Sequence, residues 1–220
     1  MSEFDAAAER ERMVREQIAV RGIRDAAVLD AMRRVPREEF VATDLRDRAY
    51  EDTPLPIAEG QTISQPYIVA MMLEAAQLKA ADRVLEIGAG SGYACAVASL
   101  IARHVDAIER HARLCDEASA RLARLGFGNV EVHCADGSAG WTAGAPYDAI
   151  LVAAAGPRIP EVLREQLAVG GRLVMPVGDA TFSQRLCKVT RLDKKSFVDE
   201  DLGGVVFVPL IGEHGWSGTR

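Results

Sequence analysis

Short apolar runs alternate along the second part of the chain with segments in which apolar residues recur every three or four positions. The runs predict buried strands, and the recurring positions predict amphipathic helices. The predicted strands are 83–87, 104–109, 130–134, 147–153 and 172–177, and the predicted helices between them are 93–102, 111–125 and 160–167. Strands and helices that alternate in this way are typical of a parallel α/β sheet.

The first part of the chain departs from this alternation. Residues 2–20, 25–35 and 37–41 have helical composition or spacing, which predicts an all-helical cap on one side of the sheet. Residues 43–66 hold three prolines and show no sustained period, so they predict a long loop ahead of a helix at 67–78. Compact domains seldom carry such a loop without a functional reason.

The alternation also stops after Gly178. Segments 185–192 and 205–210 predict two strands of a hairpin, joined by a charged turn at 193–201. The length of 220 residues predicts a single domain. Within it we expect a helical cap with a substrate loop at 1–78, an α/β core at 79–210 and a tail at 211–220.

A glycine-rich turn follows the first predicted strand of the core. Gly88, Gly90 and Gly92 stand at alternate positions, and the helix predicted from Tyr93 comes directly after them. Glycine tolerates positive φ and has no Cβ to hold a ligand away from the backbone. The start of the helix offers unpaired N–H groups and the positive end of its dipole. The turn therefore predicts a nucleotide-binding βα unit.

Three acids fall at or near the ends of predicted strands: Glu86, Glu109 and Asp136. Ligands of open α/β sheets bind beyond the carboxyl ends of the strands. Glu109 lies 17 positions after Gly92, and a carboxylate at about 20 residues from such a turn suits a ribose diol. The alternative, solvated loop acids, is weakened because all three are in register with one glycine-rich turn.

Composition limits the classes of partner. The net charge of −6 argues against the nucleic-acid backbone as the main partner. Cys95, Cys115, Cys134 and Cys187 show no C-x-x-C spacing, which favours free thiols in a reducing cytosol over disulfides or a metal site. His133 and the next residue would point to opposite faces of a strand, so we expect no metal there. We see no signal peptide and no apolar run that approaches about 18 residues.

The segment Gly60–Pro66, Gly-Gln-Thr-Ile-Ser-Gln-Pro, allows two interpretations. Ser64 and Gln65 could simply cap the following helix, with Pro66 in its first turn. The same polar side chains could instead contact a substrate or cofactor. Spacing alone does not separate the two, because a cap and a ligand contact can share one helix start.

The spacing Gly-x-Gly-x-Gly, the acid two residues before it and the terminal hairpin resemble the class I S-adenosylmethionine-dependent methyltransferases, in which the last strand inserts antiparallel into the sheet. Five motifs in order resemble one family of that class, the protein-L-isoaspartate O-methyltransferases: Gly60–Pro66, Val84–Tyr93, Ala145–Ile150, Gly170–Gly178 and Val206–Leu210. Val35–Val41 is similar to the bacterial branch. The resemblance implies a Rossmann-like α/β fold with a mostly parallel seven-stranded sheet, a C-terminal antiparallel hairpin and an N-terminal helical cap. The tail after Leu210 matches no pattern of the family.

The resemblance also implies roles for the matching residues. Ser64 is the implied active-site residue. The residues implied to hold S-adenosylmethionine, and S-adenosylhomocysteine as product, are Thr62, Ile63, Ser64, Glu86, Gly88, Gly90, Ser91, Glu109, Arg110, Asp136 and Gly137. Among them, Glu86 would hold the amino-acid part, Glu109 the ribose, and Asp136 with Gly137 the adenine. The residues implied to contact the substrate are Thr62, Ser64, Val208, Pro209 and Leu210.

The implied acceptor is the free α-carboxylate of an L-isoaspartyl residue in a damaged protein or peptide, with D-aspartyl residues as a second acceptor. A carboxyl with an unperturbed pKa near ~3.5 is already ionised at neutral pH, so no general base is needed. Catalysis then consists of positioning and desolvation, with Ser64 as a hydrogen-bond donor to the carboxylate. We expect a cytoplasmic monomer without metal, nucleic-acid or membrane partners.

Three alternatives remain at this point. A dinucleotide-dependent oxidoreductase could use the same βα turn, although the glycine spacing and the lack of a separate substrate domain count against it. A non-catalytic binding module could have kept the fold. The nearest alternative is a class I methyltransferase with a small-molecule or RNA acceptor.

Overall fold

The computed structural model describes residues 5–179 and 183–217 and contains one large sheet of seven strands, in the order β5-β4-β3-β6-β7-β8-β9. The five strands β3 to β7 run parallel, and β8 is antiparallel to its neighbours β7 and β9. The bounds are β3 Arg83–Ile87, β4 His104–Glu109, β5 Val130–Cys134, β6 Tyr147–Val152, β7 Leu167–Gly178, β8 Gln184–Arg191 and β9 Phe197–Val205. The predicted mostly parallel α/β fold is confirmed.

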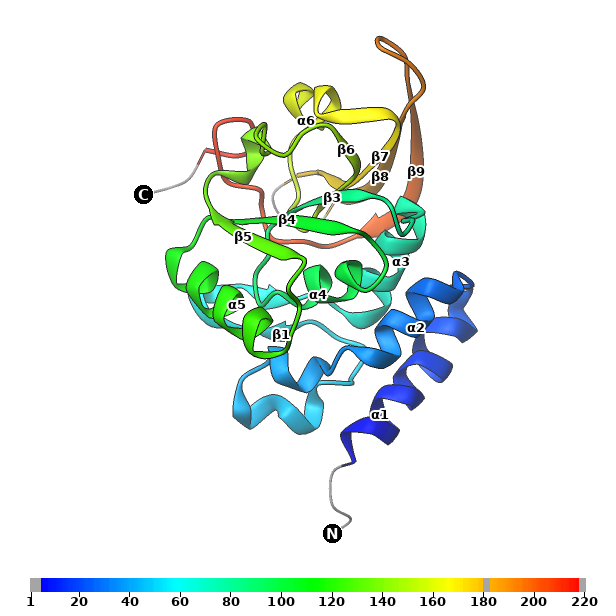
Figure 1. Ribbon diagram of the computed structural model, residues 1–220, viewed down its shortest axis with the longest axis vertical. Helices are drawn as coiled ribbons and strands as arrows, with labels where there is room; N and C mark the ends of the chain where they lie inside the picture. Colours follow the sequence, from blue (N-terminus) through cyan, green and yellow to red (C-terminus); the bar gives the residue numbers. More distant parts are fainter. Residues whose placement is uncertain (1–4, 180–182, 218–220) are drawn as a thin grey trace.

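Helices cover the two faces of the sheet unequally (Figure 1). On one face, α3 contacts β6 and β7 while α4 and α5 contact β4, and α2 packs against α3 and α4 as a further layer. On the other face, α6 packs on β7. The bounds are α1 Ala6–Arg12, α2 Ala26–Arg34, α3 Pro66–Ala76, α4 Tyr93–Ser99, α5 Ala112–Arg124 and α6 Glu161–Glu165. None of the helices within the described part of the chain combines the length and the apolar character needed to cross a bilayer.

The central strands are apolar on both sides because helices or loops cover both. Val84 and Val105 point into the core shared with the helix layer, whereas Leu85, Ile87 and Ile108 point into the opposite core. These residues are at most 2% exposed. Strands buried on two faces are nearly continuous apolar runs, which is why periodicity located them well.

The N-terminal cap is helical, as predicted, although residues 2–4 of its first predicted helix lie outside the described residues. α1 continues through a wider helical turn at η1 Met13–Ile18 and a tight turn at η2 Ala19–Arg21, and it ends at Gly22 with φ 102°. Asp25 caps α2 by accepting bonds from the N–H groups of residues 27 and 28. A short turn follows at η3 Arg37–Phe40.

The predicted loop 43–66 has structure of its own. It contains the turns η4 Thr43–Arg48 and η5 Ala58–Gly60, and β1 Leu55–Pro56 pairs antiparallel with β2 Thr62–Ile63 around η5. This small hairpin leads directly to Ser64 and then to α3. The pairing of β1 with β2 therefore fixes the segment that the sequence indicates as a ligand loop.

The C-terminal hairpin is present, but two predictions about it are wrong. Its second strand is Phe197–Val205 rather than 205–210, and the turn is correspondingly shorter. The last strand also lies at the edge of the sheet instead of inserting into it. The run Asp199–Asp201 imitates a turn in the sequence because it is acidic. On an edge strand these acids remain solvated and pair with Arg164, Lys188 and Arg185.

Candidate active site

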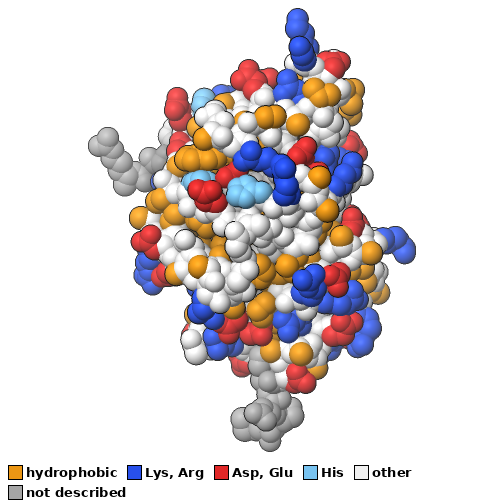
Figure 2. Space-filling view, in the orientation of Figure 1, with side chains coloured by type: hydrophobic (Ala, Val, Ile, Leu, Met, Phe, Trp, Pro, Cys, Tyr) orange, Lys and Arg blue, Asp and Glu red, His pale blue; other side chains and the backbone are white. Residues whose placement is uncertain are grey.

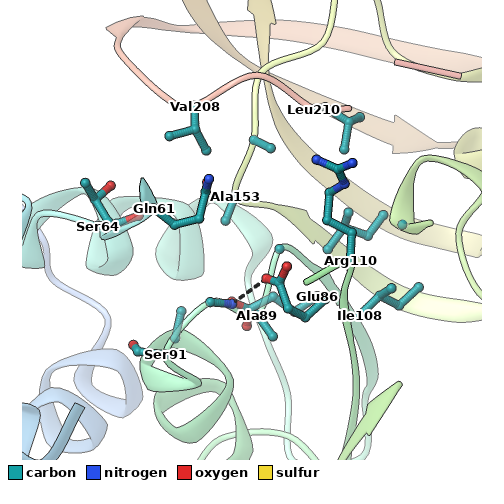
Figure 3. Close-up of a pocket in the computed structure, with 18 of the residues that line it drawn as sticks. Gln61, Ser64, Glu86, Ala89, Ser91, Ile108, Arg110, Ala153, Val208 and Leu210 are labelled. Carbon is teal, nitrogen blue, oxygen red and sulfur yellow. Dashed lines mark hydrogen bonds between the residues drawn. The ribbon is translucent and has the colours of Figure 1, made fainter. Parts of the chain in front are cut away.

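A cavity opens beyond the carboxyl ends of β3, β4 and β6, where ligands of open α/β sheets bind. The space between its walls, with the open solvent at its mouth, is about 940 Å³. Thirteen of the fourteen predicted site residues line it: Thr62, Ile63, Ser64, Glu86, Gly88, Gly90, Ser91, Glu109, Arg110, Gly137, Val208, Pro209 and Leu210. Figure 3 shows Ser64 and Val208 towards one end and Ile108 with Arg110 towards the other.

The glycine-rich turn between β3 and α4 forms one wall of this cavity. Gly88, Gly90 and Gly92 have φ of 88°, 53° and 88°, values that residues with a Cβ rarely adopt. A Cβ at Gly92 would also lie 3.2 Å from the Leu122 side chain of α5. The N–H of Gly88 donates to Ile108 O at 2.8 Å, which ties the turn to β4. The backbone of the turn is thus held against the cavity without side chains in the way.

Glu109, at the end of β4, is 5% exposed and has both carboxylate oxygens engaged. Oε2 accepts a bond from Gly90 N at 3.0 Å, and Oε1 accepts one from His111 N at 2.9 Å. Each oxygen keeps a further lone pair. The carboxylate is therefore fixed in orientation and still able to accept two hydroxyl protons, as a ribose diol requires.

Glu86, near the end of β3, is 2% exposed, and among the described residues its Oε2 has no hydrogen-bond partner. Burial raises the pKa of this carboxyl to about 8, because the charged form loses its hydration. An unpaired buried oxygen on the cavity wall is suited to a cationic group of a ligand. Such a cation would replace the missing solvation and restore the carboxylate.

Ser64 follows β2, and a buried arginine holds its main chain. Arg37 has no exposed surface; its Nη2 donates to Ser64 O at 2.8 Å and its Nε donates to Ala49 O at 2.7 Å. Gln65 occupies the N-cap position of α3, but its side chain donates to Asp52 instead of capping the helix. Within the described residues the Ser64 hydroxyl has no hydrogen-bond partner, so neither side chain serves as the helix cap. The ligand interpretation of this segment is the one that the geometry favours.

A second, more open groove meets the first cavity at Ser64. Thr62, Ser64, Ala153 and Val208 line both spaces. The groove continues between the start of α3 and the segment 202–208, which comprises the end of β9 and the three residues after it. The Ser64 hydroxyl therefore lies where the enclosed cavity meets the open groove.

Asp136 is the one predicted residue that does not line the cavity. Its Oδ1 accepts bonds from Ser138 N at 2.9 Å and Ser138 Oγ at 2.7 Å, and its Oδ2 accepts one from Glu213 N at 2.8 Å. His214 N donates to Ser138 Oγ at 3.0 Å. Asp136 thus anchors the described part of the tail, 211–217, beside the cavity, while residues 218–220 lie outside the described residues.

Sequence reasoning missed several lining residues: Gln61, Ile108, His111, Ala153 and Ile211. His111 could have been predicted, because it stands two positions after Glu109, just before α5 begins. No sequence signal indicated Ile211, because only the fold brings the tail back to the cavity.

Comparison with known proteins decides the family. The family model for protein-L-isoaspartate (D-aspartate) O-methyltransferase (PCMT) matches residues 8–215. The chain belongs to this family. It is similar to Protein-L-isoaspartate O-methyltransferase 1 of Rhodopseudomonas palustris, with 60% identity over 211 residues, 96% of this chain and 86% of that protein. It is 53% identical over 207 residues to the enzyme of that name from Protochlamydia amoebophila, covering 94% and 99%.

Solved structures agree with this membership. A protein-L-isoaspartate O-methyltransferase matches with a TM-score of 0.81 and 30% identity, over 93% of this chain and 66% of that one. A Plasmodium falciparum protein described as a beta-aspartate methyltransferase (PCMT), in complex with S-adenosyl-L-homocysteine, matches with a TM-score of 0.79 and 26% identity, over 92% and 98%. The chain is therefore an S-adenosylmethionine-dependent methyltransferase of the isoaspartate family.

The residues of the cavity fit that cofactor. S-adenosylmethionine carries an ammonium group, a ribose diol and an adenine. The orphaned oxygen of Glu86 suits the ammonium, and the two oriented oxygens of Glu109 suit the diol. Gly137 packs closely on Ile87, and Gly137 and Ile108 line the same cavity.

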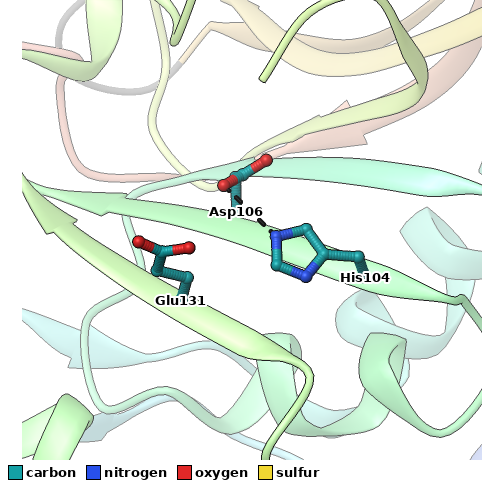
Figure 4. Close-up of side chains that lie close together, drawn as sticks. All are labelled: His104, Asp106 and Glu131. Carbon is teal, nitrogen blue, oxygen red and sulfur yellow. Dashed lines mark hydrogen bonds and ion pairs between the residues drawn. The ribbon is translucent and has the colours of Figure 1, made fainter. Parts of the chain in front are cut away.

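A second cluster of ligating side chains lies apart from the cavity. Histidine and acidic side chains gather over β4 and β5 on the face shown in Figure 2. Each of three side chains offers one atom that could bind a metal ion, and these atoms lie within 4.8 Å of one another: His104, Asp106 and Glu131 (Figure 4). Asp106 is already paired, with His133 Nε2 3.0 Å from Oδ1 and Arg83 Nη2 3.3 Å from Oδ2. Because the guanidinium opposes a cation there, we assign the cluster as a hydrogen-bonded ion-pair network of the methyltransferase fold.

Proposed function

We propose that this methyltransferase transfers the methyl group of S-adenosylmethionine to the free α-carboxylate of L-isoaspartyl residues in damaged proteins and peptides. The observation that carries the proposal is the position of the unpaired Ser64 hydroxyl, at the junction of the nucleotide-like cavity and the open groove. The names of the curated relatives support the acceptor.

The cofactor is held by residues of the sheet and of the Ser64 loop. Glu109 accepts the ribose hydroxyls, with Arg110 beside it; Glu86 holds the ammonium. The remaining contacts are made by Thr62, Ile63, Ser64, Gly88, Gly90, Ser91 and Gly137. Asp136 acts through the turn and tail that it anchors, and so supports the adenine end without lining the cavity.

The acceptor is positioned by Thr62, Ser64 and the segment Val208–Leu210. The bound cofactor supplies its methyl group on a sulfonium and is already activated. The α-carboxylate is ionised at neutral pH, so the protein needs no base to prepare it. Ser64 donates its hydrogen to one carboxylate oxygen and thereby aims the other, while the walls of the junction exclude water.

Repair follows from the ester that forms. After release, the main-chain nitrogen of the next residue attacks the methyl ester, methanol leaves, and a succinimide results. Hydrolysis of that ring returns some normal aspartyl residues. We further propose that the protein acts as a cytoplasmic monomer without nucleic acid or membrane; its four unpaired cysteines and its net charge of −6 support this.

The decisive experiment measures methyl transfer from labelled S-adenosylmethionine to a synthetic isoaspartyl peptide. The same peptide with a normal aspartyl residue is the control, and a D-aspartyl peptide tests the second acceptor. We expect transfer to the isoaspartyl peptide only or preferentially. Equal transfer to the aspartyl peptide, or none to either while the protein binds the cofactor, would point to a different acceptor such as a small molecule or RNA. Sedimentation velocity at micromolar concentration tests the monomer.

A further inference from the structure

The segment after β9 forms one side of the open groove, and a buried side chain clamps it. Gln184, at the start of β8, is 3% exposed. Its Oε1 accepts a bond from Phe207 N at 2.7 Å, and its Nε2 donates to Phe207 O at 3.1 Å and to Asp179 O at 3.2 Å. One amide thus grips both polar groups of one main-chain residue and ties it to the loop after β7.

This clamp decides which way the neighbouring main-chain groups point. In an extended chain, successive residues direct their N–H and C=O groups to opposite sides. Phe207 faces Gln184, so Val206 and Val208 face the other way. Val208 O indeed accepts a bond from Ala155 N at 2.8 Å on that side. Among the described residues no partner is found for Val206 N, Val206 O or Val208 N.

Val206 and Val208, the residues that carry these groups, lie on the wall of the groove that leads to Ser64. Val206 is 69% exposed, and both valines line the groove together with Ser64. Figure 3 places Val208 facing the loop that carries Ser64. A row of unpaired N–H and C=O groups at alternate residues is a template on which an extended peptide can add as a strand.

We propose that Gln184 is a positioning residue for the peptide: it holds Phe207 so that Val206 and Val208 pair with the main chain of the substrate next to the reacting carboxylate. The inference rests on the proposed function. In this proposal the substrate is recognised through hydrogen bonds to the main chain of Val206 and Val208. Gln184, more than 20 positions away in the sequence, holds that main chain in place. Gln184 itself touches neither cofactor nor reacting atoms.

Substitution of Gln184 should separate KM from kcat. In Gln184→Ala the template loosens, so we expect KM for an isoaspartyl peptide to rise about tenfold, the loss of one to two main-chain hydrogen bonds. The kcat at saturating peptide should change less than about threefold, because Ser64 and the cavity keep their places. Gln184→Glu keeps the acceptor for Phe207 N but loses the donor, so its KM should be intermediate or similarly raised.

Gln166 offers a matched control. It is 5% exposed and makes the same kind of clamp, accepting from Trp141 N at 2.8 Å and donating to Ala139 O at 2.9 Å, outside the groove. With saturating cofactor, Gln166→Ala should lower the unfolding midpoint about as much as Gln184→Ala and leave the KM for peptide unchanged. An equal rise of KM in both variants, or an unchanged KM in Gln184→Ala, would overturn the proposal.

A second measurement needs no variant and therefore does not depend on folding. Peptides N-methylated at single main-chain positions around the isoaspartyl residue lose one donor each. Strand pairing uses alternate residues, so N-methylation at every second position should raise KM of the unaltered enzyme and the positions between should not. A uniform or absent response would refute strand addition. If the unmethylated peptide is not a substrate at all, the proposed function fails, and this inference fails with it. If the peptide is methylated but the alternating pattern is missing, only this inference fails.

Discussion

Arg37 allows the support of the Ser64 loop to be tested apart from the stability of the fold. It is fully buried, and its two described hydrogen bonds go to the carbonyls of Ala49 and Ser64. Burial lowers the pKa of its guanidinium, the sign that the cation has lost hydration without full replacement. Its Nη1 is buried and, within the described residues, unpaired. The Tyr93 ring, with its centre 4.7 Å from the guanidinium carbon, replaces only part of that hydration, so burial of the cation lowers the stability of the fold.

Replacement by methionine removes both bonds and the charge. Two orphaned carbonyls cost about 1–3 kcal/mol each. Relief of the buried cation returns several kcal/mol, so the net loss of unfolding free energy should be about 2 kcal/mol or less. Ser64, released at its carbonyl, should drift by a fraction of an ångström to about 1 Å, which lowers kcat roughly tenfold to a hundredfold. Arg37→Lys reaches only one carbonyl and should recover part of the rate.

The assay pairs single-turnover methyl transfer to an isoaspartyl peptide with urea unfolding of each variant. Arg172 is the matched control, a buried arginine that bonds the carbonyls of Ala76 and Gln77 and pairs with Asp82 at 2.9 Å, away from the cavity. Arg172→Met leaves the buried Asp82 with the Lys79 N–H but without its cationic partner, so the variant should lose about 3–5 kcal/mol of unfolding free energy and keep kcat in the folded fraction. If Arg37→Met keeps the rate, or loses it only in proportion to folded protein, the reasoning is wrong.

The other predictions concern the cofactor cavity and the reacting carboxylate. Ser64→Ala should lower kcat about a hundredfold, the effect expected when a reactant loses the group that positions it, with the Kd for S-adenosylhomocysteine within about twofold; collapse of binding would instead make cofactor binding the main role of Ser64. Glu109→Gln should raise the Kd for S-adenosylhomocysteine at least about tenfold. Asp116→Asn, on the exposed side of α5, is the control and should leave this Kd unchanged. An equal Kd for the two variants would show that Glu109 does not bind the ribose. Because the pKa of Glu86 is raised to about 8 in the empty cavity, ligand binding releases its proton. Affinity measured by calorimetry should therefore rise from pH 6 to 8 and level off above, and the rise should be smaller in Glu86→Gln; identical profiles would contradict the assignment. The same raised pKa makes unfolding free energy of the empty protein fall as pH increases towards 8, since the folded state holds the extra proton.

Much of this fold could be predicted because its core strands are buried on both faces. Val84 to Ile87 and Tyr147 to Val152 form nearly unbroken apolar runs, and burial makes such runs unambiguous. β9 was misplaced because an edge strand needs no such run. Its acids are satisfied by cross-strand partners such as Arg185 and Lys188, and no local pattern distinguishes that from a charged turn.

The site divides in the same way. The glycine-rich turn and Glu109 are local features, and the ends of neighbouring strands bring them together as predicted. The Asp136 side chain bonds the tail instead of lining the cavity, because it accepts a hydrogen bond from the N–H of Glu213, 77 positions further along the chain. Every residue type except proline has such an N–H, so the sequence does not indicate this contact. Gln184 escaped notice for the same reason, since its bonds go to the main chain of a residue 23 positions away.

These contacts bear on how one enzyme could accept isoaspartyl residues in many different proteins. The cofactor side of the site is built from strand ends of the rigid core. The acceptor side is built from two segments outside the parallel core, each fixed by one buried polar side chain: Arg37 grips the carbonyl of Ser64, and Gln184 grips the main chain of Phe207. What these clamps present to the groove is a hydroxyl and main-chain groups, not a pocket for a particular side chain. A site of that kind selects a carboxylate on an extended chain and tolerates the residues around it, which is the selectivity that repair of damage at unpredictable positions requires.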